Sequence, residues 1–149
     1  MITGKWGLIL IKEIQKIICV GMTIFLSVAV LSGCAIEKTS RTKVRDLDYH
    51  VATEEEIPEE LKTQIEEKKA ADFKLTYETP EYLYIVRGYG EQATGGYSIQ
   101  VAELYLSSNA VFFKSTLIGP RKGENPAKSP SYPYIVVRTE KVDKNVVFE

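Results

Sequence analysis

Apolar and polar positions divide the chain into an apolar leader and a longer part in which they alternate. Residues 17–31 carry no charge and are mostly apolar, and three lysines precede them in residues 1–16. The small pair Ser32-Gly33 ends the run. A basic start, an apolar middle and a small-residue cleavage site are typical of a secretory signal. The pattern therefore predicts that residues 1–33 are a signal peptide.

The residues at the end of this run indicate what happens after cleavage. Leu31-Ser32-Gly33-Cys34 resembles a bacterial lipobox, in which the thiol of Cys34 receives a diacylglyceryl group and becomes the first mature residue. The alternative is an uncleaved membrane helix, but the run is short of the ~20 residues that span a bilayer. Two acyl chains suffice for stable anchoring. We therefore expect a lipoprotein of the bacterial cell membrane, held on its extracytoplasmic face.

The next residues change from a polar spacer to amphipathic patterns. Residues 34–45 are predominantly polar and are predicted to form a tether. Residues 46–72 should then form a strand, in which Leu47, Tyr49 and Val51 alternate with polar residues, and a helix. The helix is expected over about 58–69, where apolar residues recur every four positions. Its acidic start and basic end complement the helix dipole, which explains the glutamates with fewer assumptions than a cation site.

From Phe73 onward the apolar period is two, and turn residues separate the segments. The predicted strands are Phe73–Glu78, Tyr82–Tyr89, Tyr97–Leu106, Val111–Ile118, Tyr134–Lys141 and Val146–Phe148. Short strands at this spacing favour a mainly β domain over residues 73–149. The expected fold is a small antiparallel β-sandwich or open barrel with one N-terminal helix.

Composition limits the chemistry that the mature chain is expected to perform. Removing the signal leaves 149 − 33 = 116 residues, enough for one small domain, with a net charge of 16 − 19 = −3. This charge gives no electrostatic reason to bind nucleic acid. His50 is the only histidine, so a histidine cluster for zinc cannot form, and no pattern in the sequence marks His50 as a member of a catalytic triad. We predict no enzyme activity, no catalytic residue, no metal and no cofactor.

Two loops stand out as candidates for binding. Thr94-Gly95-Gly96-Tyr97 joins two predicted strands, either as a plain glycine hairpin or as a recognition tip. Residues 119–133 contain four prolines, and such a long loop is either functional or an idle insertion. If successive strands are antiparallel neighbours, both loops lie at one end of the sheet. The predicted partner-binding residues there are Thr94, Gly95, Gly96, Tyr97, Arg121, Lys122 and Tyr132.

The residues around the first loop resemble a known family. The run 84–99, with Gly88-Tyr89-Gly90-Glu91 leading to Thr94-Gly95-Gly96-Tyr97, and the closing run 132–137 are similar to the C-terminal domain of the PrcB family. The resemblance covers about residues 73–141, and Ala93 stands where family members often have proline. The family is named for a lipoprotein subunit of a bacterial surface protease complex. The resemblance implies a non-catalytic accessory role with a protein partner, such as a protease.

Other functions stay open at the level of the sequence. The Thr94–Tyr97 turn also resembles the Asn-Pro-Thr-Thr-Gly-Tyr loop of chagasin-type inhibitors of cysteine proteases, although the Asn-Pro part is missing here. Exposed tyrosines would suit a carbohydrate- or cell-wall-binding module. A hydrolase of unrecognised type is the remaining alternative, because two carboxylates can meet in space without any signal in the sequence.

Overall fold

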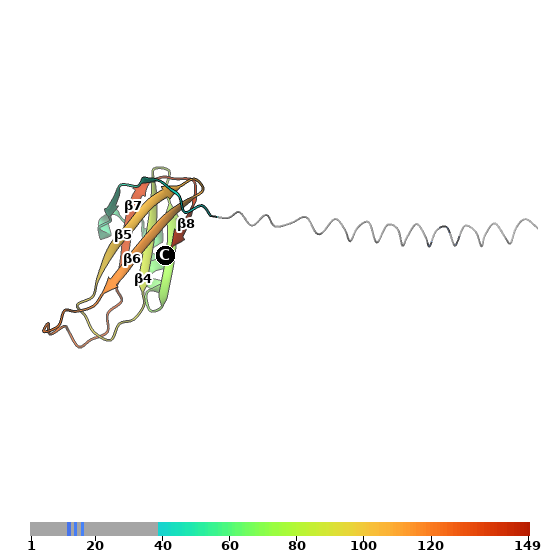
Figure 1. Ribbon diagram of the computed structural model, residues 1–149. Coiled ribbons are helices and arrows are strands. Elements are labelled where there is room, and N and C mark those ends of the chain that lie inside the picture. The colour runs from blue at the N-terminus through green and yellow to red at the C-terminus, as the bar shows by residue number, and fades with distance from the viewer. Residues whose placement is uncertain (1–11, 13, 15, 17–38) are drawn as a thin grey trace, which may run out of the picture. The chain divides into compact units, whose positions relative to one another are not determined.

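Two four-stranded sheets face each other in the main part of the chain (Figure 1). The computed structural model describes residues 12, 14, 16 and 39–149, and residues 39–149 form a unit of their own. The predicted lipobox with Cys34 and the beginning of the predicted tether lie outside the described residues. Within the described residues, no helix is long and apolar enough to span a bilayer.

The order of the strands defines the two sheets. Sheet A has the order β1-β5-β6-β8, and sheet B has the order β2-β7-β4-β3. In chain order the elements are β1 (Lys43–Asp46), β2 (Tyr49–Val51), the 3-10 helix η2 (Glu54–Glu56), α2 (Glu59–Lys68), β3 (Asp72–Glu78), β4 (Tyr82–Tyr89), β5 (Ser98–Ser107), β6 (Ala110–Ile118), β7 (Tyr134–Glu140) and β8 (Asn145–Phe148).

Within residues 39–149 the mainly β fold with one amphipathic α-helix is confirmed, and the sandwich is the correct alternative because neither sheet closes into a barrel. The neighbouring strands are antiparallel except for β6 and β8, which are parallel. The predicted helix and the strands from Phe73 onward lie within one residue of the observed bounds. Turn residues and a period of two therefore identified these elements correctly.

The strand expected at the start of residues 46–72 is present as β2 (Tyr49–Val51), but it is shorter than expected and a further strand precedes it. The chain forms β1 from Lys43, inside the segment expected to be a tether, and then crosses to sheet B as β2. Leu47 lies between the two strands and is 3% exposed, whereas Tyr49 is 44% exposed. The physical reason is that Leu47 enters the core between the sheets, where its N–H donates to the carbonyl of Leu104. The alternation of Leu47, Tyr49 and Val51 with polar residues therefore does not correspond to one face of a single strand.

Two apolar layers hold the domain together. The layer between the sheets contains Leu83, Ile85 and Val137 from sheet B and Val111 and Phe113 from sheet A. The second layer lies on the outer face of sheet B, which α2 covers. Its helix residues Leu61 and Ile65 are at most 1% exposed and belong to one cluster with Tyr84, Val86 and Val136. The four-residue spacing in α2 thus places one apolar stripe on the sheet.

The connections between the sheets differ from the simple order that the sequence suggested. Strands β4 and β5 follow each other in the chain but lie in different sheets, and the same holds for β6 and β7. Both connections therefore cross from one sheet to the other. They are the two loops that the sequence analysis singled out.

The chain enters sheet A at the turn between β5 and β6. The N–H of Ser40 donates to Oδ1 of Asn109 at 2.9 Å, and Lys43 pairs with Ser107 in the ladder. Because β6 runs from Ala110 to Ile118, the loop after Ile118 lies at the opposite end of this strand. In Figure 1 the start of the domain (blue-green) and the 119–133 loop (orange) accordingly lie at different ends.

Candidate interaction surface

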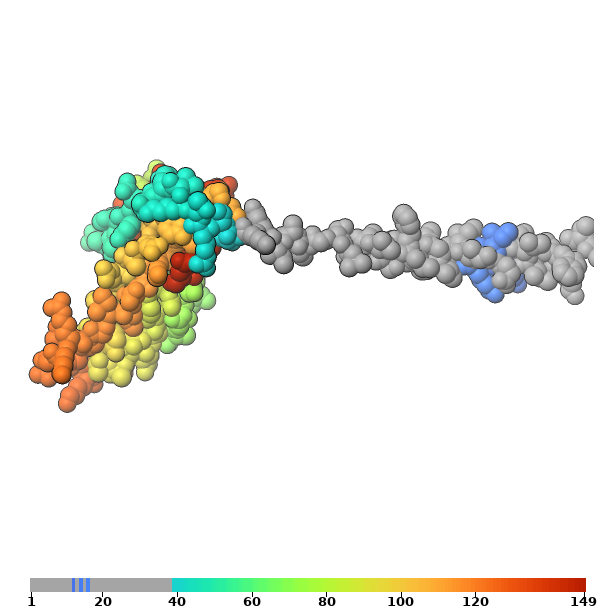
Figure 2. Space-filling view, viewed as in Figure 1, coloured from blue at the N-terminus to red at the C-terminus, as the bar shows by residue number. Residues whose placement is uncertain are grey.

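The two crossover loops meet at one end of the sandwich. Gln92 and Ser131 form an isolated antiparallel bridge with N···O distances of 2.8 and 3.0 Å. We call residues 91–97 and 119–133 together the loop rim. Figure 2 shows the orange segment of the rim as a projection beside the yellow one. The expected meeting of the loops therefore occurs, although β4 and β5 are not neighbours in a sheet.

Further hydrogen bonds fasten the first loop to the second. The N–H of Gly95 donates to the carbonyl of Ala127 at 2.9 Å. The hydroxyl of Ser131 donates to the carbonyl of Thr94 at 2.7 Å. These bonds join residues more than 30 positions apart in the chain. The loops form one hydrogen-bonded structure, and the 119–133 segment is not an independent insertion.

Gly96 has the backbone conformation that explains the glycine pair. Its φ is +81°, a region that favours glycine, and a Cβ there would lie 3.1 Å from Pro126 and 3.2 Å from Pro120. The prediction of a plain hairpin at Gly95-Gly96 is wrong, because the strands on either side belong to different sheets. The glycine instead lets the first loop pack closely against the prolines of the second.

The outer part of the rim is a tight turn that carries positive charge. The N–H of Glu124 donates to the carbonyl of Arg121, and the carboxylate of Glu124 accepts from the N–H of Arg121. Gly123 has a φ of +95° with no atom within 4 Å of a Cβ position. Arg121 and Lys122 are both exposed. The two predicted cations therefore lie next to each other on a closed turn in open surroundings.

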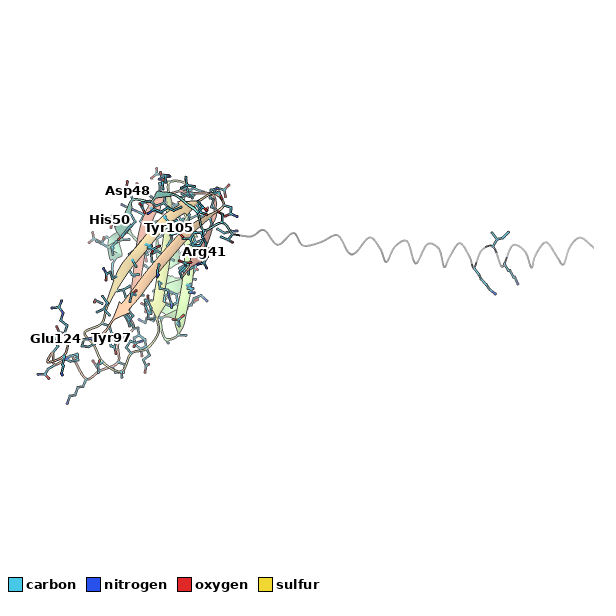
Figure 3. All side chains as sticks on the ribbon, viewed as in Figure 1. Arg41, Asp48, His50, Tyr97, Tyr105 and Glu124 are labelled. Carbon is cyan, nitrogen blue, oxygen red and sulfur yellow. The ribbon has the colours of Figure 1, made fainter. Side chains whose placement is uncertain are left out.

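Tyr97 directly precedes β5 and is half-buried. One of its ring carbons is 3.5 Å from the Cβ position of Gly119, the first residue of the second loop. Figure 3 shows Tyr97 and Glu124 at the same end of the domain. Tyr97 therefore helps to support the base of the second loop.

Tyr132 lies in different surroundings from the other predicted residues. Its hydroxyl donates to the carboxylate of Glu91 at 2.8 Å, and the Lys69 ammonium lies 5.9 Å from the ring centre. The bond to Glu91 raises the pKa of Tyr132 above its ordinary value. Lys69 follows the end of α2, so Tyr132 faces the helix side of the domain. The contacts of Tyr132 thus do not join it to Arg121 and Lys122.

Several residues of the rim escaped the sequence analysis. Glu91, Gln92, Pro126, Ala127 and Ser131 make the contacts that hold the loops together. Pro126 carried a signal as one of the four prolines in the second loop, and Glu91 lay in the motif that carries the family resemblance. Gln92 and Ala127 act through backbone groups, which almost any residue type supplies, so the sequence gave no signal for them.

A second polar cluster lies near the start of α2. The carboxylate of Glu56 accepts from the N–H of Thr53 at 2.9 Å, and it lies 2.9 Å from Nε2 of His50 and 3.3 Å from Arg138. The hydrogen bonds with Thr53 and His50, the Thr53 backbone bond first, lower the pKa of Glu56 from 4.5 to about 2. His50 itself is an exposed residue of β2. The cluster links β2, β7 and η2, which is a structural task.

An open cleft of about 290 Å³ adjoins this cluster. Its lining includes Tyr49, Tyr82 and Arg138. Tyr82 does not present a free ring, because the guanidinium of Arg138 lies 4.6 Å from its centre. Within residues 39–149 and the three described leader residues, no group of three or more histidine, cysteine or acidic residues is arranged to hold a metal ion.

Comparison with known proteins supports the family resemblance. Residues 83–140 match the family model described as PrcB C-terminal, which confirms the resemblance over this segment. The match extends from β4 to β7 and includes both loops of the rim. Comparison with curated proteins gave no match, and comparison with solved structures gave none either.

Proposed function

We propose that this chain is a lipid-anchored, non-catalytic module that binds a protein partner through the loop rim. The partner in this proposal is a protease or another envelope protein, for which the chain acts as an accessory subunit. The observation that carries the proposal is the set of hydrogen bonds that joins the two loops, including the Gln92–Ser131 bridge. These bonds hold the backbone, the prolines and the charged side chains of the rim in one arrangement. A preorganised surface of this kind lowers the entropic cost of binding.

The family match supports the accessory role. PrcB is the name of a protease-complex subunit family, and the matched residues 83–140 include the whole rim. Conversely, no triad or cofactor motif was found in the sequence. A binding role needs only shape and charge, which the rim offers.

The anchor in this proposal is a diacylglyceryl group on Cys34, in the cell membrane and on its outer side. The lipobox pattern supports it. Cys34 precedes Thr39 by only five residues, and the chain enters the domain beside Asn109, at the end of β6 opposite the rim. A short tether at that end would leave the rim free for a partner.

The inhibitor alternative has less support from the geometry. An inhibitory loop that enters a protease cleft must project, whereas Gly95 is bonded to Ala127 and Gly96 packs against Pro120 and Pro126. The first loop is therefore backed by the second. We retain the accessory role as the single proposed function.

The proposal is tested by capture of partners from solubilised membranes with the full-length chain. The test variant is Tyr97→Ala combined with Arg121→Ala, and the control is Lys114→Ala, an exposed residue of β6 outside the rim. We expect the wild-type and control chains to retain one stoichiometric partner and the test variant to lose it. Equal recovery by all three chains would refute the rim as the binding surface.

A further inference from the structure

We propose that the rim recognises an acidic protein surface, through Arg121, Lys122 and Lys128. This inference rests on the proposed function and specifies the chemistry of the partner. The three side chains are exposed. They lie in the second loop of the rim, two of them on the closed turn that ends at Glu124.

Charge is distributed unevenly over the domain. Four of the 19 Lys and Arg and two of the 20 Asp and Glu precede residue 39, so residues 39–149 carry a net charge of 15 − 18 = −3. The segment 119–133 holds three of these cations and one anion, a net +2, which leaves −5 on the remainder. The second loop is thus a positive projection from an acidic body. Such a distribution steers an acidic partner toward the projection and away from the rest of the surface.

The cations of the rim are also available, unlike most others in the domain. Arg45, Arg87 and Arg138 form ion pairs with Glu140, Asp72 and Glu56. Within residues 39–149, by contrast, the side chains of Arg121, Lys122 and Lys128 form no hydrogen bond or ion pair. The one carboxylate of the second loop, that of Glu124, is bonded to the backbone of Arg121. A partner therefore gains these contacts without breaking an existing ion pair.

The same geometry favours carboxylates on a protein over a phosphate polymer. Phosphate sites typically use converging backbone N–H groups, and the N–H groups of Arg121 and Glu124 are already bonded within the turn. A long polyanion would also meet the negative remainder of the domain. Three spaced cations between prolines suit single carboxylates scattered over a folded surface, where Pro120 and Pro126 offer rigid apolar contact.

The direct test measures binding of a labelled twelve-residue peptide of alternating Glu and Ser to the full-length chain in non-ionic detergent, by fluorescence anisotropy. The controls are the same peptide with Gln for Glu, and labelled inorganic polyphosphate. The test variant is Arg121→Glu with Lys122→Glu. The matched variant is Lys68→Glu with Lys114→Glu, which makes the same change of net charge at exposed positions outside the rim.

We expect the Glu peptide to bind with at least about tenfold higher affinity than the Gln peptide. We expect the variant Arg121→Glu with Lys122→Glu, called the rim reversal, to bind the Glu peptide about tenfold more weakly than wild type. The matched variant should stay within about twofold of wild type, and added salt should weaken binding. Equal binding by wild type and the rim reversal, or an equal loss in both variants, would overturn the inference. Tighter binding of polyphosphate than of the peptide would overturn it too.

A second arm separates this inference from the proposed function. Partners are captured from solubilised membranes with the rim reversal and with Tyr97→Ala. If the rim reversal keeps the partner that Tyr97→Ala loses, the rim binds a partner, but the inference that the partner surface is acidic is wrong. If both variants keep the partner, the proposed function fails with it. Loss of the partner by the reversal, together with binding of the Glu peptide, supports both.

Discussion

At the scale of single residues, the ring of Phe73 in β3 determines which residue fits at its paired position, Gly88, in the adjacent strand β4. A Cβ at Gly88 in β4 would lie 1.9 Å from the ring of Phe73, its partner in β3. Phe73 is 8% exposed, so its ring has little room to move. Close packing against Phe73 therefore requires a glycine at position 88, the first of the Gly-Tyr-Gly sequence at the end of β4.

Substitution of Gly88 by alanine tests this packing. We expect Gly88→Ala to lower the free energy of unfolding by about 1–3 kcal/mol, because the added methyl group overpacks the site. The control Gly95→Ala should change it by no more than about 0.5 kcal/mol, since its Cβ would have 3.5 Å of space. Urea denaturation followed by circular dichroism gives both values. A smaller effect of Gly88→Ala in a Phe73→Leu background would confirm the contact, and an unchanged effect would reject it.

The acid behaviour of Glu56 follows from its contacts. Because its pKa is lowered to about 2 in the folded state from 4.5, the carboxylate stabilises the fold fully above about pH 4.5. This contribution is lost as the pH falls through the folded pKa. We expect wild type to be more stable than Glu56→Gln at neutral pH, and the difference to vanish between pH 4.5 and 2. In the control Glu55→Gln, an exposed neighbour, a difference that is independent of pH is expected.

A carbon-detected NMR titration of the Glu56 carboxyl measures the cause of this behaviour directly. An apparent pKa near 4.5 would contradict the hydrogen-bonded arrangement with Thr53 and His50.

At the scale of elements, the hydrogen bonds between the two loops should be measurable as slow amide exchange. The N–H of Gly95 is bonded to Ala127, and the hydroxyl of Ser131 holds the carbonyl of Thr94. We expect the Gly95 amide to exchange slowly, and Ser131→Ala to accelerate it by about fivefold, in line with the loss of one hydrogen bond of about 1 kcal/mol. Ser129→Ala, an exposed change in the same loop, is the control. Rapid exchange of Gly95 in wild type would show that the loops are independent.

The sequence predicts elements well where one physical signal dominates. A period of two and clear turns located β3 to β8 within one residue, and the stripe of Leu61 and Ile65 located α2. The prediction of strand positions was inaccurate at residues 43–53, because Leu47 is buried between the sheets while Tyr49 and Val51 at a sheet edge are exposed. Short edge strands lack a complete apolar face, so their pattern carries little information.

The position of the candidate rim was predictable from the sequence, but the hydrogen bonds that hold it together were not. The glycine pair and the four prolines marked the two loops. Their bonding through Gln92, Ala127 and Ser131 was not predictable, since it depends on backbone groups brought together by two crossovers between the sheets. Tyr132 was grouped with the rim cations on the basis of proximity in sequence, but the Lys69 ammonium over its ring shows that it faces the helix side of the domain.

At the scale of the whole molecule, the proposed anchor at Cys34 predicts the first residue of the processed chain and its modification. Mass spectrometry of the protein from membranes should find a first residue Cys34 that carries a diacylglyceryl group. Cys34→Ser should keep the leader and lose the lipid, whereas Cys19→Ser, inside the apolar run, should be processed as wild type. An unmodified Cys34 in a chain that retains the leader would contradict the proposed anchor and the proposed location.

The central claim is that a protein partner contacts the rim and not the opposite end of the domain. Site-specific photo-crosslinking in intact cells tests it most directly, with a photoreactive residue at Lys122 in the rim or at Ser108 in the exposed turn between β5 and β6. We predict one discrete protein adduct from position 122 and none from position 108. An adduct of equal strength from both positions, or from position 108 alone, would contradict the account.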